Sequence, residues 1–113
     1  MPDVMTRDLL CVPLDMVDAG EEYNSRKYSA ADIKLLADEM LATGRQLQPV
    51  GLALNGDGLY RLVYGFRRYK ALKMLQTRVE DSHPLKQIEG VLLDVDAQDH
   101  KTLFEFNVRE NSN

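Results

Sequence analysis

The sequence predicts a small α+β domain in which short strands alternate with amphipathic helices. Two segments, one beginning at Ser29 and one after Gly65, have apolar residues at the three- and four-residue spacings of a helix. Between them, residues 49–64 have alternating apolar residues around an Asn-Gly-Asp-Gly turn, which is typical of a β-hairpin. The chain of 113 residues is long enough for one modest hydrophobic core.

The first strand is expected within residues 9–17, LLCVPLDMV, because β-formers around a proline are typical of a short edge strand. This segment holds the only cysteine, Cys11, which we expect to be a buried, inert thiol rather than a reactive one. The polar residues 18–29 are expected to form a loop. The lone cysteine, and the lack of a signal peptide or a bilayer-spanning apolar run, indicate a cytoplasmic protein.

The first helix has a marked beginning and end. Ser29 and Asp32 form the S-x-x-D capping pattern, and Gly44 is expected to end the helix in a left-handed conformation. Its buried face is predicted to contain Ile33, Leu36, Ala37, Met40 and Leu41.

The hairpin is expected to pair a strand containing Val50, Leu52 and Leu54 with a strand over residues 59–64. Gly65 then breaks the strand, and a second helix follows to about Gln76. The apolar face of this helix is expected to bury Tyr69, Leu72 and Leu75. A further strand is predicted over 88–95, and a final helix from about Gln98 is expected to turn Leu103, Phe104 and Val108 inward.

Basic residues concentrate in the second hairpin strand and the helix after it. The formal net charge of the chain is −4, yet residues 58–79 include no acidic residue. The basic residues of this segment are Arg61, Arg67, Arg68, Lys70, Lys73 and Arg78. One basic segment in an acidic protein indicates a local anion site, although a solvated helix face would give the same pattern.

Arg67 and Arg68 lie in the first turn of the second helix, where the helix dipole disfavours a cation by about 0.3–1 kcal/mol. A strand, a glycine and a helix start is also the arrangement in which backbone N–H groups converge on an anion. Guanidinium groups there add donors suited to phosphate oxygens. The pair therefore predicts a polyphosphate site, unless both side chains face solvent and pair with carboxylates of the chain.

Three stretches together resemble the N-terminal domain of ParB-family partition proteins, also called the ParB-like nuclease domain, whose fold is shared with sulfiredoxin. The stretch YRLVYGFRRYKALKML resembles the family's strand followed by G-E-R-R-x-x-A. NSRKYSAADIKLLADEMLATGRQLQPV resembles its Q-P-R-K loop, capped helix and G-x-x-Q-P turn, and RENSN the start of its E-N-x-x-R motif. The resemblance implies a ParB/sulfiredoxin-like fold with a short mixed sheet, a hairpin and about three helices. It also implies that residues 1–113 are one domain, followed in the whole protein by a helix-turn-helix.

The resemblance implies a CTP-binding switch in which nucleotide and Mg²⁺ close two such domains as a clamp on DNA. It further implies a homodimer, a partner ATPase, and a nucleoid-associated protein of chromosome or plasmid partition, encoded by a bacterium, plasmid or phage. By position, the nucleotide would be bound by Arg26, Gly44, Gln48, Pro49, Gly65, Phe66, Arg67, Arg68 and Ala71. Glu110 and Asn111 would approach the metal, since their oxygens suit Mg²⁺.

Two departures from the family pattern bear on catalysis. Phe66 replaces the glutamate that the family uses in hydrolysis, and Asn24 replaces the glutamine of the Q-P-R loop. A phenylalanine can neither accept a proton nor orient water. We therefore expect CTP binding with weak or absent hydrolysis.

Other activities fit the sequence less well. Sulfiredoxin chemistry needs a reducing cysteine in the motif that here reads Gly65-Phe66-Arg67-Arg68, and Cys11 is far from it in sequence. A metal-dependent nuclease needs clustered carboxylates, whereas those of this chain are scattered. Two alternatives stay open: a DNA- or protein-interaction module that does not use nucleotide, and a small kinase or nucleotidase on the same fold.

Overall fold

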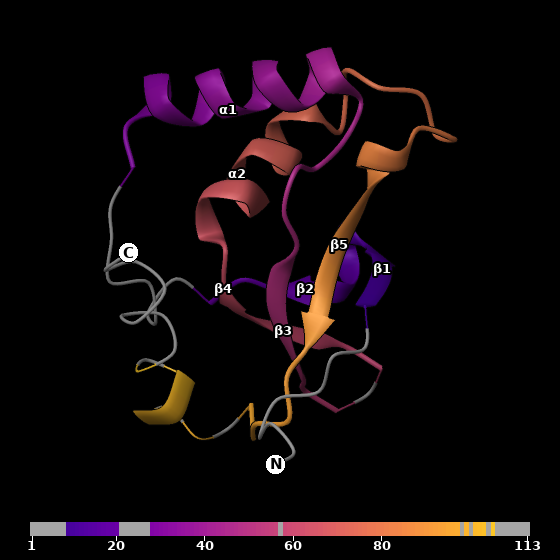
Figure 1. Ribbon diagram of the computed structural model, residues 1–113. Helices are drawn as coiled ribbons and strands as arrows, with labels where there is room; N and C mark the ends of the chain where they lie inside the picture. Colours follow the sequence, from indigo (N-terminus) through magenta and orange to yellow (C-terminus); the bar gives the residue numbers. More distant parts are fainter. Residues whose placement is uncertain are drawn as a thin grey trace.

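The computed structural model describes residues 9–20, 28–56, 58–97, 99, 101–103 and 105. It has a five-stranded sheet in the order β1-β5-β3-β4-β2 and two long helices, α1 and α2, which lie together at one end of it (Figure 1). The strands are β1 (Leu9–Pro13), β2 (Val17–Asp18), β3 (Val50–Leu54), β4 (Tyr60–Tyr64) and β5 (Gln87–Leu92). The helices are α1 (Ala30–Thr43), α2 (Phe66–Leu75) and the 3₁₀ turns η1 (Leu14–Met16) and η3 (Pro84–Lys86). The predicted α+β class is confirmed.

The sheet is mixed and strongly curled. β3 pairs antiparallel with β4 and parallel with β5, β1 pairs antiparallel with β5, and β2 pairs parallel with β4. The edge strands β1 and β2 are nevertheless joined by the three residues of η1 alone. Five flat strands would place the edge axes about 19 Å apart, whereas the link from Pro13 to Val17 can span about 14 Å at most. The two edges must therefore curve towards each other.

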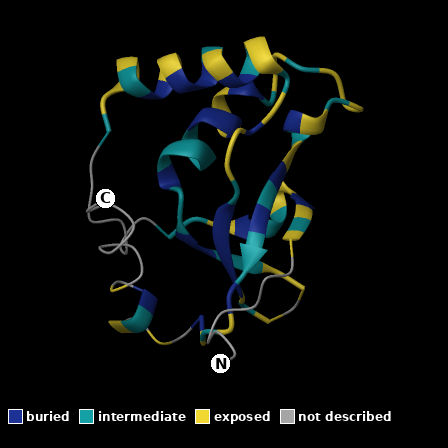
Figure 2. Cartoon of the chain, viewed as in Figure 1, coloured by how far each residue is buried: buried dark blue, intermediate teal, exposed yellow. Residues whose placement is uncertain are grey.

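The main hydrophobic core lies between one face of the sheet and the two helices (Figure 2). Met40 of α1 and Leu72 and Leu75 of α2 are fully buried there, together with Leu52 and Leu62 of the sheet. Each such side chain contributes about 1.5–3 kcal/mol by leaving water. A smaller core covers the other face and consists of Ala53, Val63, Leu93, Ala97 and Leu103.

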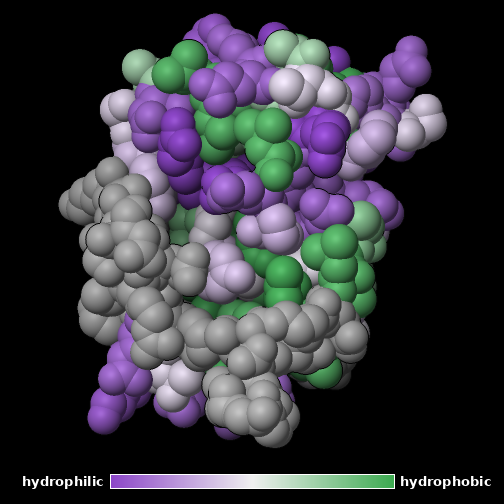
Figure 3. Space-filling model, in the orientation of Figure 1, coloured by the Kyte–Doolittle hydropathy of each residue, from purple (hydrophilic) through white to green (hydrophobic). Residues whose placement is uncertain are grey.

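The first helix forms as the sequence predicts. The Ser29 hydroxyl accepts a hydrogen bond from the backbone N–H of Asp32 at 3.0 Å, and Gly44 ends α1 with φ 73°. Ile33, Leu36, Ala37 and Met40 are buried, while Leu41 is only partly so. The opposite side of α1 faces outward and consists mainly of hydrophilic residues (Figure 3).

Several expectations are wrong in detail. Cys11 is exposed, because in β1 the alternate residue Val12 points into the core. Residues 9–17 form two strands around η1 rather than one. The hairpin does not alternate as expected, since β3 has neighbours on both faces: Gly51 and Ala53 are buried, whereas Leu54 is exposed.

The last helix can be followed in part. Residues 101–103 and 105 are helical and Leu103 is fully buried, as predicted, while Phe104 and Val108 lie outside the described residues. Asp99 begins this helix by accepting bonds from the Thr102 backbone and hydroxyl at 3.1 and 2.7 Å. Within the described part of the chain, no helix is long and apolar enough to cross a membrane.

Candidate anion site at the start of helix α2

Gly65 joins β4 to α2 and lies directly against β3. Its φ of 94° is in the left-handed region, and a Cβ placed on it would come within 2.5 Å of Val50 Cγ1 and 3.2 Å of Val50 Cα. Glycine is thus required both by the backbone conformation and by close packing on the strand. As a result, the N-terminus of α2 is fixed against the sheet, next to the loop that leads into β3.

Arg67 forms an ion pair with the first turn of α1. Its Nε and Nη2 donate to Asp32 Oδ2 and Oδ1 at 3.1 and 3.0 Å, which is a bidentate arrangement. The pair links the first turns of the two helices, and it neutralises the charge that the dipole of α2 disfavours. Of the two possibilities that the sequence left open, an anion site or pairing with a carboxylate of the chain, Arg67 shows the second.

Arg68 is in a different environment. Its Nη2 donates to Gln48 Oε1 at 2.6 Å, while its buried Nε has no hydrogen-bond partner, and no carboxylate of the described residues pairs with it. Burial lowers the pKa of Arg68, and the charge of Arg67 acts in the same direction, whereas Tyr28 and Tyr64 raise it. A guanidinium keeps its proton in proteins. The lowered pKa therefore indicates a cation without adequate compensation, which a bound anion would supply.

The loop between α1 and β3 positions Gln48. Gln46 is 7% exposed, and its Nε2 donates to the carbonyls of Gln48 and Glu89 at 2.8 Å, while its Oε1 accepts from the Glu89 N–H at 2.6 Å. These bonds fix the loop to β5. The next residue, Leu47, has φ 85°, a strained conformation for a residue with a branched side chain. Sequence reasoning missed Gln46, because one glutamine among polar neighbours gives no sign of burial.

Replacement of Gln46 by alanine is expected to destabilise the fold by about 2–4 kcal/mol, since three backbone groups lose their partner in a buried place. Urea unfolding followed by circular dichroism measures this loss. Gln87→Ala, at an exposed position of β5, is the matched control and should change stability by about 0.5 kcal/mol or less. Equal effects of the two substitutions would contradict the anchoring role of Gln46.

The other predicted site residues are placed as follows. Gly65, Arg68, Gln48 and, through the same loop, Pro49 are close together, and Gly44 begins this loop at the end of α1. Phe66 and Ala71 are 1% and 0% exposed as whole residues and belong to the main core, beneath the start of the candidate site.

Three predicted site residues, one for the nucleotide and two for the metal, have no described position. Arg26, Glu110 and Asn111 lie outside the described residues. Within the residues that are described, no group of three or more His, Cys, Asp or Glu side chains could hold a metal ion.

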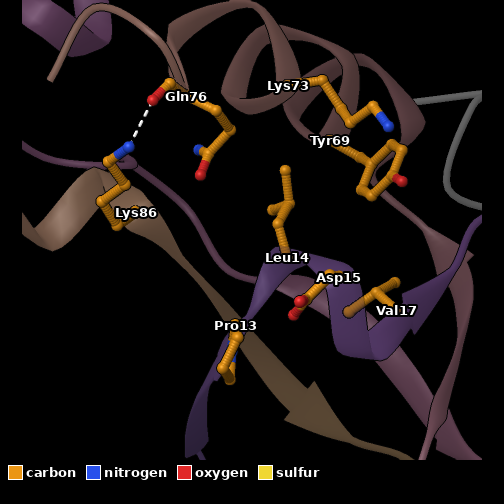
Figure 4. Close-up of a pocket in the computed structure, with 8 residues that line it drawn as sticks. All are labelled: Pro13, Leu14, Asp15, Val17, Tyr69, Lys73, Gln76 and Lys86. Carbon is orange, nitrogen blue, oxygen red and sulfur yellow. Dashed lines mark hydrogen bonds between the residues drawn. The ribbon is translucent and has the colours of Figure 1, made fainter. Parts of the chain in front are cut away.

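A cavity of about 710 Å³ lies on another face of α2, between this helix and η1 (Figure 4). None of the predicted site residues lines it. Much of its polar lining completes the end of α2: Lys86 Nζ donates to the Gln76 carbonyl, and Gln76 Nε2 donates to the carbonyls of Leu72 and Leu85 at 2.9 Å. Such bonds satisfy the last carbonyls of a helix. Capping therefore accounts for these groups, and the candidate anion site is the one at Arg68.

Solved structures with a similar fold include two of a chromosome-partitioning protein. The C-terminally truncated chromosome-partitioning protein ParB from Caulobacter crescentus, complexed with CTP-gamma-S, is similar with a TM-score of 0.69 and 22% identity, over 92% of this chain and 52% of that one. The same truncated protein complexed to the centromeric parS site gives 0.64 and 19%, over 90% and 46%. SbnI with C-terminal truncation from Staphylococcus aureus gives 0.54 and 18%, over 79% and 31%.

Neither a protein-family model nor a curated relative matches the chain. The chain spans about half the length of the two ParB chains, and at these identities the likeness is one of fold. The mixed sheet with its hairpin and the helix that begins just after Gly65 agree with what the sequence motifs led us to expect. The chain therefore has a ParB-like fold.

Proposed function

We propose that this chain is the CTP-binding switch domain of a ParB-like DNA partition or regulatory protein. The observation that carries the proposal is Arg68, a partly buried cation at a helix N-terminus that has one uncharged partner among the described residues and an Nε without a hydrogen bond to them. Such a group stabilises the fold poorly by itself and binds an anion well. The similar Caulobacter protein, solved with CTP-gamma-S and with parS, supports the choice of nucleotide and of DNA.

In this proposal the triphosphate binds against the first turn of α2. Arg68 donates from its guanidinium, and the backbone N–H groups at the start of the helix add to it. Arg67 acts mainly by holding α1 and α2 together through Asp32. Gly44, Gln48, Pro49 and Gly65 line the pocket, and Arg26 assists. Phe66 and Ala71 lie beneath the pocket, where the small side chain of Ala71 permits close packing.

Mg²⁺ would be bound by Glu110 and Asn111 and would neutralise part of the phosphate charge. Two copies of the domain would then close as a clamp on DNA, in a homodimer that works with a partner ATPase near the nucleoid. A helix-turn-helix after residue 113 would read the DNA sequence.

We expect this site to bind CTP with little or no hydrolysis. The side chain of Phe66 points into the core and offers no group to activate water. A phosphate-release assay with CTP and Mg²⁺ tests this expectation. Rapid turnover by the wild-type chain would contradict it and would assign an activity to the site.

Titration calorimetry with CTP, ATP and GTP, each with Mg²⁺, tests the proposed function. We expect CTP to bind in preference to the other two nucleotides, and binding to weaken as salt rises because the phosphates interact with cations. Sodium tripolyphosphate should compete with CTP for the site. If none of the nucleotides binds, the proposal is wrong.

One observation favours a second candidate, an interaction module that does not use nucleotide. Because Asp32 neutralises Arg67, the start of α2 offers one uncompensated guanidinium, that of Arg68, rather than two. A single guanidinium is sufficient for one DNA phosphate or one carboxylate of a partner protein. Mobility-shift assays with and without CTP separate the two functions, since only the switch domain should respond to the nucleotide.

A further inference from the structure

We infer that the side chain of Gln48 is a built-in competitor for the phosphate site, which occupies Arg68 when no anion is bound and moves aside when a polyphosphate binds. This inference rests on the proposed function and adds a means of regulation to it. It also gives separate roles to two residues of the loop between α1 and β3: Gln46 anchors the loop and Gln48 competes with the phosphate.

The contact itself has the geometry of a substitute ligand. Gln48 Oε1 lies 2.6 Å from Arg68 Nη2, a distance as short as a charge-assisted hydrogen bond to an anionic oxygen. The carboxamide is an oxygen acceptor like a phosphate, but it has no net charge and fills one donor only. The buried Nε of Arg68 is left unpaired. A phosphate group, which brings charge and several oxygens, should therefore displace the carboxamide.

The loop is built to release this side chain. The three hydrogen bonds of Gln46 fix the loop to β5 just before Gln48. Leu47, which lies between Gln46 and Gln48, has φ 85° and is 44% exposed, so burial of its side chain does not offset the strain of a left-handed leucine. Gln48 is itself exposed and free to swing into solvent. The backbone of the loop is therefore held in place while the side chain of Gln48 can move.

Two substitutions of Gln48 test the inference with opposite expected signs. Gln48→Ala removes the competing oxygen, and we expect CTP with Mg²⁺, and sodium tripolyphosphate, to bind about 3–10-fold more tightly. Gln48→Glu supplies a carboxylate that pairs with Arg68, and we expect binding at least about tenfold weaker. Calorimetry measures both, and Gln87→Ala, an exposed glutamine of β5, is the matched control that should leave affinity unchanged.

A third substitution tests whether the backbone of the loop stays in place. A glycine at residue 47 adopts φ 85° without cost, so Leu47→Gly should keep the loop in position and leave polyphosphate affinity unchanged, whereas a clear change in affinity would show that binding moves the backbone as well. Thermal melts confirm that each variant is folded, which we expect because Leu47 and Gln48 are exposed.

The outcomes separate this inference from the proposed function. If Gln48→Ala weakens binding, Gln48 is an ordinary ligand contact: the competitor role is wrong and the nucleotide site stands. An unchanged affinity in Gln48→Ala also overturns the competitor role. If neither the wild-type chain nor any variant binds CTP or tripolyphosphate, the proposed function fails and the inference fails with it.

Discussion

Arg68→Ala is expected to lower the affinity for CTP and for tripolyphosphate about 100-fold or more, because each charge-assisted hydrogen bond to a phosphate contributes about 1.5–3 kcal/mol. The free energy of unfolding should change little or rise slightly, since the substitution removes a partly buried cation whose Nε has no partner. Calorimetry and urea unfolding measure the two effects. Loss of binding without loss of stability is what distinguishes a ligand-binding arginine from a structural one.

Arg67→Ala is the matched control for this experiment, one residue away in the same helix turn. It breaks the bidentate pair with Asp32, whose partners are 33% and 43% exposed, so the cost in stability should be below about 1 kcal/mol. We expect affinity to fall about fivefold or less, through the loosened contact between α1 and α2. Equal losses of affinity in the two variants would contradict the division of roles between the arginines.

Gly65→Ala is expected to destabilise the chain by about 3 kcal/mol or more, which corresponds to a fall in Tm of roughly 10–20 °C. Part of the effect comes from the left-handed φ of 94°. The larger part comes from the new Cβ, which would overlap Val50 at the centre of the main core and meet its backbone at 3.2 Å. Differential scanning calorimetry gives the magnitude directly.

Gly44→Ala separates the two contributions. Gly44 has a similar left-handed φ of 73°, but a Cβ there would have no atom within 4 Å, so only the backbone term of about 1 kcal/mol applies. A double-mutant cycle with Val50→Ala should make Gly65→Ala less costly but not neutral, because it removes Cγ1 at 2.5 Å and leaves the Cβ of residue 50 at 2.8 Å. If Gly44→Ala and Gly65→Ala cost the same, close packing on β3 is not the reason for the glycine.

Local signals in the sequence were enough to predict the helices. Ser29, Asp32 and Gly44 mark the ends of α1 through contacts within a few residues of each other, and the structure has those contacts. The curled sheet could not be predicted in the same way, because it depends on pairing between β1 and β5, which lie near opposite ends of the chain. The sequence places glycines at 51 and 90, but only the fold shows that they face Tyr64 and Leu52.

The sequence indicated where the candidate anion site lies, but it did not indicate how the two arginines are arranged there. Gly65 and the two arginines identify the start of α2, yet Arg67 and Arg68 are the same residue type in the same basic segment. Their different roles arise because successive residues of a helix point about 100° apart. One arginine therefore meets Asp32 of α1, and the other meets the loop that carries Gln48. The burial of Phe66 likewise depends on the core beneath it and could not be predicted from its position in the motif.

The antiparallel pairing of β1 with β5 has a consequence for how the chain folds. Pro13 pairs with Gln87 and Leu9 with Val91, so the first strand must wait for a partner that lies far later in the sequence. Contacts between such distant parts of a chain carry a large entropy of loop closure and form slowly. Until β5 arrives, the newly made polypeptide exposes an unpaired strand edge, the kind of surface that chaperones protect and that promotes aggregation.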